Sequence, residues 1–464
     1  MALKIEEQEL SVEIIQKFDR PVPRYTSYPT VPFWKNDYGP QQFLDAIEKA
    51  GQKQEPLSIY FHIPFCERRC AFCGCNTHIT KRKSRGTEYL DTLLQIEMKT
   101  ISERLGERRK YSQLHLGGGT PTFLTPKQLQ RLFTTFNETF EPVKHAEQSI
   151  EIHPSVTTEE HILTLLDNGI NRLSLGVQDF DPLVQEKIRR YQTFEETKHI
   201  IEFARDHGVL SINIDLIYGL PYQTKQGFKK TMELINQIRP DRLAVYSYAH
   251  LPKIFKHQSI FPEDKIPRGK EKLELFLIAR NSLIENGYRQ IGFDHFALPT
   301  DDLWKAYKEE TLQRNFMGYT TKAGTDLIAF GYSSISDINN TYAQNTKDLW
   351  KYHELTKKYG VSTIRGIKLT PDDVARKDAI MTWLCQFKIN TKELRDKHKS
   401  AAEALIKDIE THFPTYEKIG LTERVAPEQW KATALGRLFA RVVAASLDKY
   451  IKNGTPDVLF SQSI

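Results

Sequence analysis

Short β-branched and aromatic segments alternate with amphipathic segments between about residues 57 and 250. Six of the short segments are typical of strands, namely LSIYFHIP, QLHLGGG, SIEIHP, RLSLGVQ, SINIDLIYGL and RLAVYSY. Between them, apolar positions three or four apart predict helices in TEYLDTLLQIEMKTISERL, TPKQLQRLFTTFNETF and TEEHILTLLDNG, each with a Thr near its start that can cap the helix. The alternation predicts parallel strands joined by right-handed helical crossovers.

The polar positions of these segments favour a barrel over an open doubly wound sheet. A barrel gathers its chemistry at the carboxyl ends of many strands, whereas a doubly wound sheet concentrates it at one switch point. Polar or glycine residues follow strand after strand: the cysteine loop, Gly117 to Thr120, Glu151, Gln178, Asp215, and Tyr248 to His250. We therefore expect an α/β fold built on a partial (β/α)6 TIM-like barrel.

The segments that flank the barrel have different patterns. The stretch FDRPVPRYTSYPT, rich in proline and aromatic residues, predicts an extended arm that covers the barrel mouth. After about residue 370 helices dominate, from LTPDDVARKDAIMTWL with its Thr-Pro cap to ATALGRLFARVVAASLDKYI. A short strand near LTERVA hints at a winged helix, for which packing against the barrel is favoured over DNA binding. We divide the chain into an N-terminal arm and helix (1–50), the barrel with its cysteine loop (51–300), a barrel-covering extension (301–369) and a C-terminal helical domain (370–464).

Composition places the chain among ordinary globular proteins. Its 464 residues are 39% hydrophobic and 27% charged, enough to bury a large core. No run approaches the roughly 18 apolar residues of a membrane helix, and the start MALKIEEQEL lacks the apolar core of a secretory signal. We expect a cytoplasmic protein without a membrane partner.

The net charge of +6 includes one dense basic run, formed by Lys81, Arg82, Lys83 and Arg85. A solvated loop is the favoured interpretation of this run, and attraction of a carboxylated substrate is the alternative. Nucleic-acid binders usually interleave a basic patch with aromatic residues. No nucleic-acid partner is therefore expected.

Four of the five cysteines fall between Cys66 and Cys75, which indicates ligation or redox chemistry and not a disulfide framework. The fifth, Cys385 in the apolar run MTWLCQF, is expected to be a buried inert thiol. The C-x3-C-x2-C spacing of Cys66, Cys70 and Cys73 allows one loop to hold three corners of a 4Fe-4S cluster and leaves one iron open. S-adenosylmethionine can chelate that iron, and one electron from the reduced cluster can then break a carbon–sulfur bond.

A zinc knuckle is the alternative for the same cysteines. Structural zinc needs a second pair of ligands at a suitable distance, and only His78 lies nearby. The aromatic Phe72 before the last ligand, the preceding strand and the GGGT segment after the next strand all favour the iron–sulfur cluster.

The GGGT segment does not fit a dinucleotide fingerprint, because Thr122 stands where the third glycine belongs. Its glycines permit close approach of the backbone to a ligand. Backbone carbonyls and Thr120 can hold the ammonium group of S-adenosylmethionine, while Glu151 and Asp215 offer carboxylates to its ammonium or ribose. For either acid, a buried salt bridge is the alternative.

Cys75 lies outside the three-ligand spacing. As a fourth ligand it would turn the site into an electron carrier, but a C-x-C pair cannot easily reach two irons. A structural thiol is a second alternative. We favour a catalytic thiol that faces the substrate cavity.

The chain resembles the oxygen-independent coproporphyrinogen III dehydrogenases (oxidases) of the radical S-adenosylmethionine (SAM) superfamily over almost its whole length. The resemblance is carried by PRYTSYPT, YFHIPFCERRCAFCGCN, LHLGGGTPTFL, SIEIHP, NRLSLGVQDF, NIDLIYGLP, YAHLP, DHFA, RNFMGYTT and TDLIAFGYSSIS. It implies that a 5'-deoxyadenosyl radical converts two propionates of coproporphyrinogen III to the vinyls of protoporphyrinogen IX, in haem biosynthesis. An unactivated hydrogen resists any side-chain base, so a cofactor has to supply this step.

The resemblance also implies the residues of the site. Cys66, Cys70 and Cys73 hold the cluster, and the SAM contacts are Tyr60, Phe72, Gly118, Gly119, Thr120, Glu151, Gln178, Arg190, Asp215, Ala249 and Ile335. Family members can hold a second SAM beside the first. Arg24 and Arg314, or the basic run, are candidates to pair with propionates. The implied protein is a monomer that takes electrons from a donor such as flavodoxin or ferredoxin.

Two departures and several rival functions stand beside this resemblance. His153 occupies a position in SIEIHP where an acid is expected, and the similarity thins past about residue 390. Another radical SAM tetrapyrrole enzyme that opens haem, a haem-binding chaperone and a plain electron-transfer protein are the alternatives. The cysteine at Cys75 and the RNFMGYTT segment favour the dehydrogenase.

Overall fold

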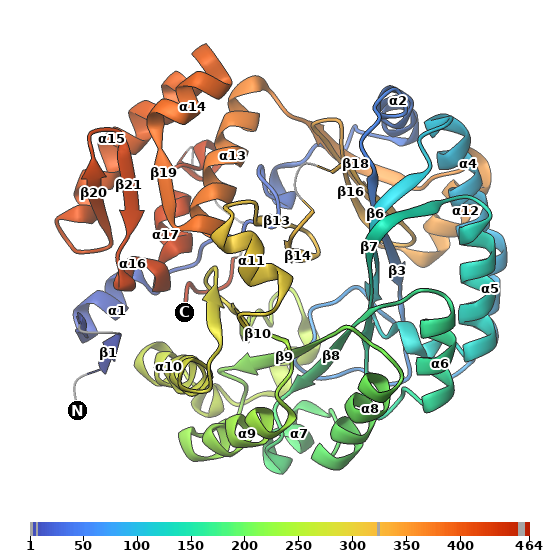
Figure 1. Ribbon diagram of the computed structural model, residues 1–464, viewed down its shortest axis with the longest axis horizontal. Helices are drawn as coiled ribbons and strands as arrows, with labels where there is room; N and C mark the ends of the chain where they lie inside the picture. Colours follow the sequence, from blue (N-terminus) through green and yellow to red (C-terminus); the bar gives the residue numbers. More distant parts are fainter. Residues whose placement is uncertain (1–2, 6–7, 323–324, 453–459) are drawn as a thin grey trace.

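The six predicted strands lie side by side in the parallel part of a twelve-stranded sheet in the computed structural model, which describes residues 3–5, 8–322, 325–452 and 460–464. They are β3 Leu57–Ile63, β6 Lys110–Gly118, β7 Glu141–Ile152, β8 Arg172–Gln178, β9 Ser211–Tyr218 and β10 Arg242–Ser247. Each strand lies beside its predecessor in the chain, and every neighbouring pair is parallel. This order confirms the partial barrel, and within the described residues the sheet does not close on itself (Figure 1).

Helices cover the outside of the curved sheet (Figure 1). They are α4 Gln95–Leu105, α5 Pro126–Asn137, α6 Glu159–Asp167, α7 Pro182–Ile188, α8 Phe194–Asp206, α9 Lys225–Ile238 and α10 Gly269–Glu285. The predicted caps at the starts of α5 and α6 are confirmed, because the hydroxyls of Thr125 and Thr158 accept hydrogen bonds from Gln128 N and His161 N. The cap predicted at Thr87 is wrong. The helical segment begins earlier, with α3 Ser84–Glu88, and the Thr87 hydroxyl accepts a bond from Gln128 Nε2.

Further strands extend the sheet at both edges. Next to β10 lie β12 His295–Ala297 and then β11 Arg289–Ile291; next to β3 lie β15 Leu327–Phe330, β16 Ile335–Ile338, β17 Thr341–Asn345 and β18 Thr363–Lys368. Much of the segment predicted to cover the barrel therefore continues its sheet. The hairpin of β13 Gln313–Asn315 and β14 Gly318–Thr320 reaches the barrel interior, where Thr320 accepts a hydrogen bond from Gln113 on β6.

The N-terminal arm packs between the barrel and the C-terminal domain. It lies between α1 Val12–Phe18 and α2 Pro40–Ala50, and its Tyr25 is buried with its hydroxyl donating to Asp448 at 3.0 Å. The arm is therefore fixed by contacts with a segment more than four hundred residues away.

The C-terminal domain combines helices with a small sheet and forms a lobe beside the barrel (Figure 1). Its elements are α13 Pro371–Gln386, β19 Lys388–Asn390, α14 Thr391–His398, α15 Glu403–Glu417, β20 Thr422–Ala426, β21 Gln429–Ala432, α16 Ala434–Leu438, α17 Ala440–Ala445 and α18 Lys449–Lys452. The Thr370 cap and the strand near LTERVA are confirmed. Among the described residues no helix is both long and apolar enough to span a membrane.

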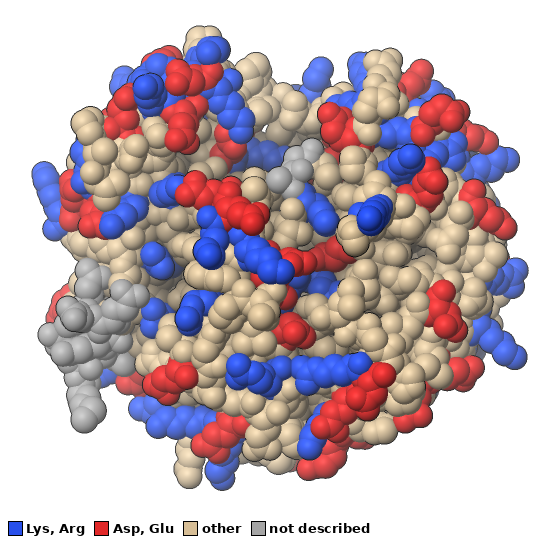
Figure 2. Space-filling view, viewed as in Figure 1, with Lys and Arg blue, Asp and Glu red and all other residues tan. Residues whose placement is uncertain are grey.

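Figure 2 shows Lys and Arg interspersed with Asp and Glu over the face viewed, without one large area of either sign. On this face, charges of both signs are therefore mixed. Long-range electrostatic attraction by this face is weak because charges of opposite sign lie close together.

Candidate functional site

The cysteines lie in a loop that leaves the carboxyl end of β3. The loop is closed by a short parallel pairing of β4 Phe65–Cys66 with β5 His78–Ile79, so the residues between them bulge over the barrel. Backbone bonds from Gly119 N to Ile63 O and from Thr120 N to Phe65 O attach the loop to the end of β6. The cysteine loop and the GGGT segment are thereby built as one unit.

A cavity of about 620 Å³ lies beneath this loop at the carboxyl ends of the strands. It brings together most of the predicted site residues. They are Cys66, Cys70, Phe72, Cys73, Cys75, Gly118, Gly119, Thr120, Glu151, Gln178, Arg190 and Asp215. The prediction that polar strand ends converge is borne out for this set.

The three thiols of the C-x3-C-x2-C motif face this cavity in a way that suits a cluster of several metal ions. In the part of the chain that the structure describes, no three Cys, His, Asp or Glu side chains are close enough to share one ion. In a cubane each thiolate binds a different iron, so the sulfurs stand apart around a larger body. Three cysteines on one cavity wall fit that donor set and leave the fourth iron free for another ligand.

The protonation of these thiols differs along the loop. Burial raises the pKa of Cys66 to about 11 and raises that of Cys70. Hydrogen bonds from Cys75, including its backbone N at 3.4 Å from the Cys73 Sγ, lower the pKa of Cys73 to about 7. Cys73 is therefore the motif thiol that ionises most easily. Cys75 itself is exposed in the cavity wall.

The glycines after β6 serve the packing of the loop as well as access to the cavity. A Cβ on Gly119 would lie 2.8 Å from the Phe65 carbonyl oxygen and 3.0 Å from Cys66 Sγ. Gly118 adopts φ +116°, and a Cβ there would strike the His62 ring. A side chain at Gly119 would therefore displace the cysteine loop, and one at Gly118 would displace His62 of β3.

Glu151 and Asp215 face the cavity with different protonation states. Burial raises the pKa of Glu151, but His115, 3.5 Å away, and the Gly118 N–H, 3.1 Å away, outweigh it and lower the value. Burial and then the charge of Glu151 raise the pKa of Asp215 to about 7. A cation placed between the two carboxylates would be attracted by Glu151 and would favour ionisation of Asp215.

Arg190 joins the loop to the barrel. Its guanidinium donates to the Gly176 carbonyl on β8, and Nη1 lies 3.8 Å from Cys70 Sγ. The neighbouring His153 also lines the cavity, and burial followed by the charge of Arg190 lowers its pKa to about 2. His153 is thus neutral. At a position where an acid was expected, the cavity wall therefore has a polar side chain without charge.

Three predicted SAM contacts do not line the cavity in the structure. Tyr60 lies close to it, because its ring stacks on His115 and its hydroxyl is 3.2 Å from His62 Nδ1. Ala249 follows β10, and Ile335 packs beside a separate apolar cluster of the sheet extension. The roles of Tyr60, Ala249 and Ile335 stay predictions.

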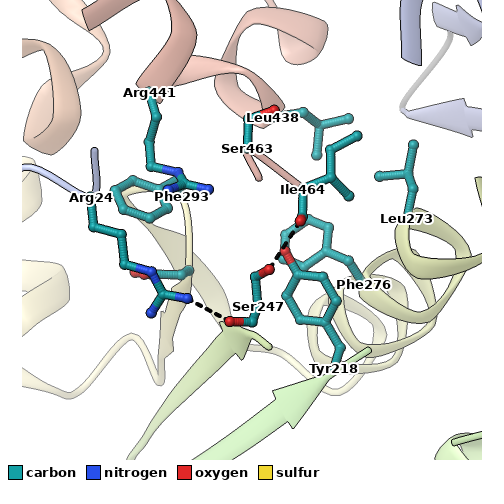
Figure 3. Close-up of a pocket in the computed structure, with 11 residues that line it drawn as sticks. Arg24, Tyr218, Ser247, Leu273, Phe276, Phe293, Leu438, Arg441, Ser463 and Ile464 are labelled. Carbon is teal, nitrogen blue, oxygen red and sulfur yellow. Dashed lines mark hydrogen bonds between the residues drawn. The ribbon is translucent and has the colours of Figure 1, made fainter. Parts of the chain in front are cut away.

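The two arginines predicted to meet propionates lie elsewhere. Arg24 borders a small pocket of about 30 Å³ between the arm, the barrel and the C-terminal domain, where it donates to the Ser247 carbonyl at 2.5 Å (Figure 3). Arg314 is buried over the rings of Phe293 and Tyr319. Neither guanidinium lines the large cavity.

The cavity contains arginines that the sequence analysis did not select, namely Arg68, Arg69 and Arg189. Arg68 and Arg69 lie within the motif CERRC, between the first two cysteines, and all three are exposed. For Arg68 and Arg69, their place in the cysteine loop was the signal from which their position at the cavity could have been predicted. These arginines place positive charge at the cavity rim. Attraction of a carboxylated substrate, which was the alternative role of the basic run, can be exerted by this charge.

The basic run mainly belongs to the loop's own structure. Lys83 pairs with Glu67 at 2.9 Å and lies 4.1 Å from the centre of the Phe123 ring, while Arg85 pairs with Glu88 at 2.9 Å. Lys81 and Arg82 are exposed, as a solvated loop predicts. Cys385 is buried, and burial raises its pKa to about 12, in agreement with an inert thiol.

Comparison with known proteins gives matches of two kinds. The model of the radical SAM superfamily matches residues 60–235, which hold the cysteine loop and the barrel strands β6 to β9. A protein from Escherichia coli named oxygen-independent coproporphyrinogen III oxidase is 39% identical over 465 residues, covering 100% of both chains. A protein of the same name from Synechocystis sp. is 36% identical and covers 98% of both.

A solved structure supports the same relationship. The structure of coproporphyrinogen III oxidase from Escherichia coli, described as a radical SAM enzyme, superposes with a TM-score of 0.87 at 39% identity. It covers 93% of this chain and 100% of its own. The similarity therefore includes the arm and the C-terminal domain as well as the barrel.

Proposed function

This chain belongs to the oxygen-independent coproporphyrinogen III oxidases of the radical SAM superfamily, and from that premise we propose that it decarboxylates coproporphyrinogen III oxidatively. Two propionate side chains lose carbon dioxide and hydrogen and become the vinyl groups of protoporphyrinogen IX. The reaction needs no oxygen and is a step of haem biosynthesis. The substrate is a small-molecule tetrapyrrole.

One observation carries the proposal: three motif thiols face a cavity whose other walls are polar strand ends. When bound, a 4Fe-4S cluster and SAM supply one-electron cleavage of the sulfonium and a 5'-deoxyadenosyl radical that removes an unactivated hydrogen. The protein contributes binding, orientation and exclusion of competing reactions. A cavity of about 620 Å³ falls within the ordinary range for small-molecule sites.

We assign Cys66, Cys70 and Cys73 to the cluster. Arg190 holds the loop against β8 and lowers the cost of negative charge on Cys70. Glu151 offers an ionised carboxylate to the ammonium or ribose of SAM. We assign further SAM contacts to residues of the cavity walls, namely Phe72, Gly118, Gly119, Thr120, Gln178 and Asp215. The resemblance to the family adds Tyr60, Ala249 and Ile335 to this assignment.

We assign a catalytic role to Cys75. Its side chain is exposed on the cavity wall, next to Cys73 in the loop. It is thus placed to touch a molecule that enters the cavity. A thiol at that point can donate a hydrogen bond to a propionate carboxylate and so help to hold the reacting side chain in place.

The proposal extends to partners and location. The enzyme acts as a monomer in the cytoplasm, binds one or two SAM molecules, and has no nucleic-acid or membrane partner. It takes electrons from a donor protein such as flavodoxin or ferredoxin. The need for a donor follows from the single-electron chemistry of the cofactor pair.

Anaerobic reconstitution with iron and sulfide tests the proposal. The holoprotein is reduced with dithionite and incubated with SAM and coproporphyrinogen III. We expect 5'-deoxyadenosine and a tetrapyrrole that has lost carbon dioxide and hydrogen from two side chains, detected by mass spectrometry. A product that keeps all its carboxylates, or stoichiometric tetrapyrrole binding without 5'-deoxyadenosine, would rule the function out.

A further inference from the structure

Each turnover of the proposed reaction consumes an electron that has to reach the cysteine loop from outside the protein. The cavity beneath the loop is where SAM and the tetrapyrrole are placed, so an electron donor needs a second approach. We therefore expect the donor to bind near a part of the loop that does not line the cavity. This inference rests on the proposed function.

A segment after β10 contacts the cysteine loop, and its residues 251–262 do not line the cavity. His257 Nε2 lies 2.7 Å from the Cys73 carbonyl oxygen, and Gln258 Nε2 donates to the Phe72 carbonyl at 2.9 Å. The ring of Phe255 packs so close to Gly74 that a Cβ there would lie 3.2 Å from it. The segment thus touches three consecutive residues of the loop, the last ligand among them.

The outward side of this segment is apolar and basic. The side chains of Ile254 and Ile260 are 51% and 49% exposed. Lys253 and Lys256 are also exposed, and the acids that follow the segment, Glu263 and Asp264, pair with Arg268 and Lys265. None of these four side chains lines the cavity. We call the four the entry face.

The composition of the entry face suits a transient protein complex. Electron-transfer partners meet over small interfaces with an apolar centre and a charged rim. Positive charge at the rim attracts an acidic partner and raises the association rate. Isolated exposed isoleucines are common, but here two lie beside two lysines on a segment that contacts the ligand loop directly.

We propose that the entry face is the docking site of an acidic one-electron carrier protein. The carrier's reduced centre loses one electron, and the oxidised cluster held by the cysteine loop gains it. No bond is made or broken and no proton has to move. Electrons then enter from one side of the loop while SAM and the tetrapyrrole occupy the other.

Charge reversal tests the proposal. The double variant Lys253→Glu/Lys256→Glu of the reconstituted protein is reduced by flavodoxin, an acidic carrier, under stopped-flow observation of the cluster's absorbance. We expect the second-order rate to fall about tenfold or more at low salt and the difference to shrink in high salt. Reduction by dithionite, and tetrapyrrole turnover driven by dithionite, should stay within about twofold of the parent.

A matched control separates local charge from net charge. Lys392 on α14 and Lys407 on α15 are exposed on the C-terminal lobe (Figure 1), and Lys392→Glu/Lys407→Glu changes the net charge by the same amount. We expect this variant to accept electrons from flavodoxin like the parent. An equal loss in both variants would overturn the proposal, and so would an unchanged rate in Lys253→Glu/Lys256→Glu.

Cross-linking provides a readout that does not depend on catalysis. A carbodiimide joins carboxylates of bound flavodoxin to nearby lysines, and peptide mapping should find Lys253 or Lys256 in the product. Cross-links confined to other lysines would overturn the proposal. Failure of dithionite to drive tetrapyrrole conversion would contradict the proposed function and not the docking site. The reduction rates and the cross-links would still test the entry face in that case.

Discussion

Charged side chains gather at both ends of the barrel interior, and the two groups are arranged in opposite ways. Toward the amino ends of the strands, Glu147 accepts from Arg172 at 3.0 Å and from Gln113 at 2.8 Å, with Arg242 3.6 Å away. Arg242 in turn pairs with Asp301 at 2.7 Å. Every formal charge in this group has a partner of opposite sign within the protein.

At the carboxyl ends the charged groups share a cavity instead. Glu151 and Asp215 both line it, and burial followed by the charge of Glu151 raises the pKa of Asp215. Arg68 and Arg69 lie exposed at its wall, and the neighbouring acid of their loop, Glu67, pairs with Lys83. The comparison teaches that charged groups paired with one another inside the protein stabilise the barrel. Charged groups that face a cavity are instead available to a ligand.

The largest expected effects come from substitutions of the cysteines at the carboxyl end, and they distinguish a cluster ligand from a thiol that faces the substrate. Cys70→Ser removes a ligand, so we expect loss of the cluster's visible absorbance and of all turnover. Cys75→Ser should keep the cluster spectrum and lose tetrapyrrole conversion, since its thiol is assigned to the substrate side. Absorbance after anaerobic reconstitution and product analysis by mass spectrometry measure both.

Loss of the cluster in Cys75→Ser would show that this thiol supports metal binding. Unchanged conversion would show that it is dispensable. Cys385→Ser is the control, because Cys385 is buried in the apolar contact between α13 and the β13–β14 hairpin region and does not line the cavity. It should leave the cluster spectrum as in the parent.

At the amino end, Glu147→Gln should reduce stability and leave SAM affinity intact. Removing one partner of a buried ion pair leaves charge uncompensated and typically costs about 3–5 kcal/mol. Here Arg172 loses the carboxylate with which it forms an ion pair, and Asp301 is bonded to Arg242. The denaturation midpoint of the metal-free protein measures the loss. A midpoint equal to the parent's would show that the network contributes little.

The sequence predicted the parts of this molecule that depend on local patterns. The six barrel strands alternate strictly with helices, and the chain order alone determines their neighbours. The strand β15 was missed because its place depends on a distant partner: Ile328 pairs with Ile59 of β3, and β16 to β18 then continue the sheet as neighbours in the chain. The turn after β15 also breaks the pattern, since Gly331 and Ser333 adopt positive φ.

The site shows the same division. Residues at strand ends, such as Glu151 and Asp215, could be predicted because parallel strands bring their carboxyl ends to one rim. The direction of a side chain in a loop could not be predicted from the sequence. Arg24 and Arg314 turn toward Ser247 and toward two aromatic rings, while Arg68 and Arg69 reach the cavity wall.

Asp215→Asn tests whether charge at the carboxyl end serves a ligand. We expect SAM affinity to fall about 10- to 100-fold, the value of a lost charge-assisted hydrogen bond. The pKa of Asp215 is about 7, so a cationic ligand binds better once the proton has left. Affinity of the parent should therefore rise with pH from about 6 to 8, whereas the variant should show no such rise.

Isothermal titration of the reconstituted protein with SAM measures this dependence. The denaturation midpoint of Asp215→Asn should match the parent's, in contrast to Glu147→Gln. A variant that binds SAM as tightly as the parent at pH 8 would remove Asp215 from the ligand site.

The smallest effect compares two buried glutamates with different partners. Glu97 on α4 accepts from Gly331 N at 2.7 Å, Asn345 Nδ2 at 2.6 Å and Tyr352 OH at 2.9 Å, and none of these donors is a cation. Burial therefore dominates and raises its pKa to about 7. For Glu147, burial is outweighed by Arg172 and Arg242, and the pKa falls to about 2.

The two pKa shifts predict opposite dependences of stability on pH. The folded protein binds a proton at Glu97 more tightly than the unfolded chain does, so its contribution falls as pH rises from 4.5 to about 7. The contribution of Glu147 is present above 4.5 and is lost as pH falls toward 2. Between pH 5 and 7, Glu97→Gln should gain on the parent by about 1 kcal/mol per pH unit, whereas the deficit of Glu147→Gln should stay constant. Denaturation midpoints of the metal-free proteins across this range measure both, and parallel curves for Glu97→Gln and the parent would show that hydrogen bonds from neutral donors stabilise a buried carboxylate as well as arginines do.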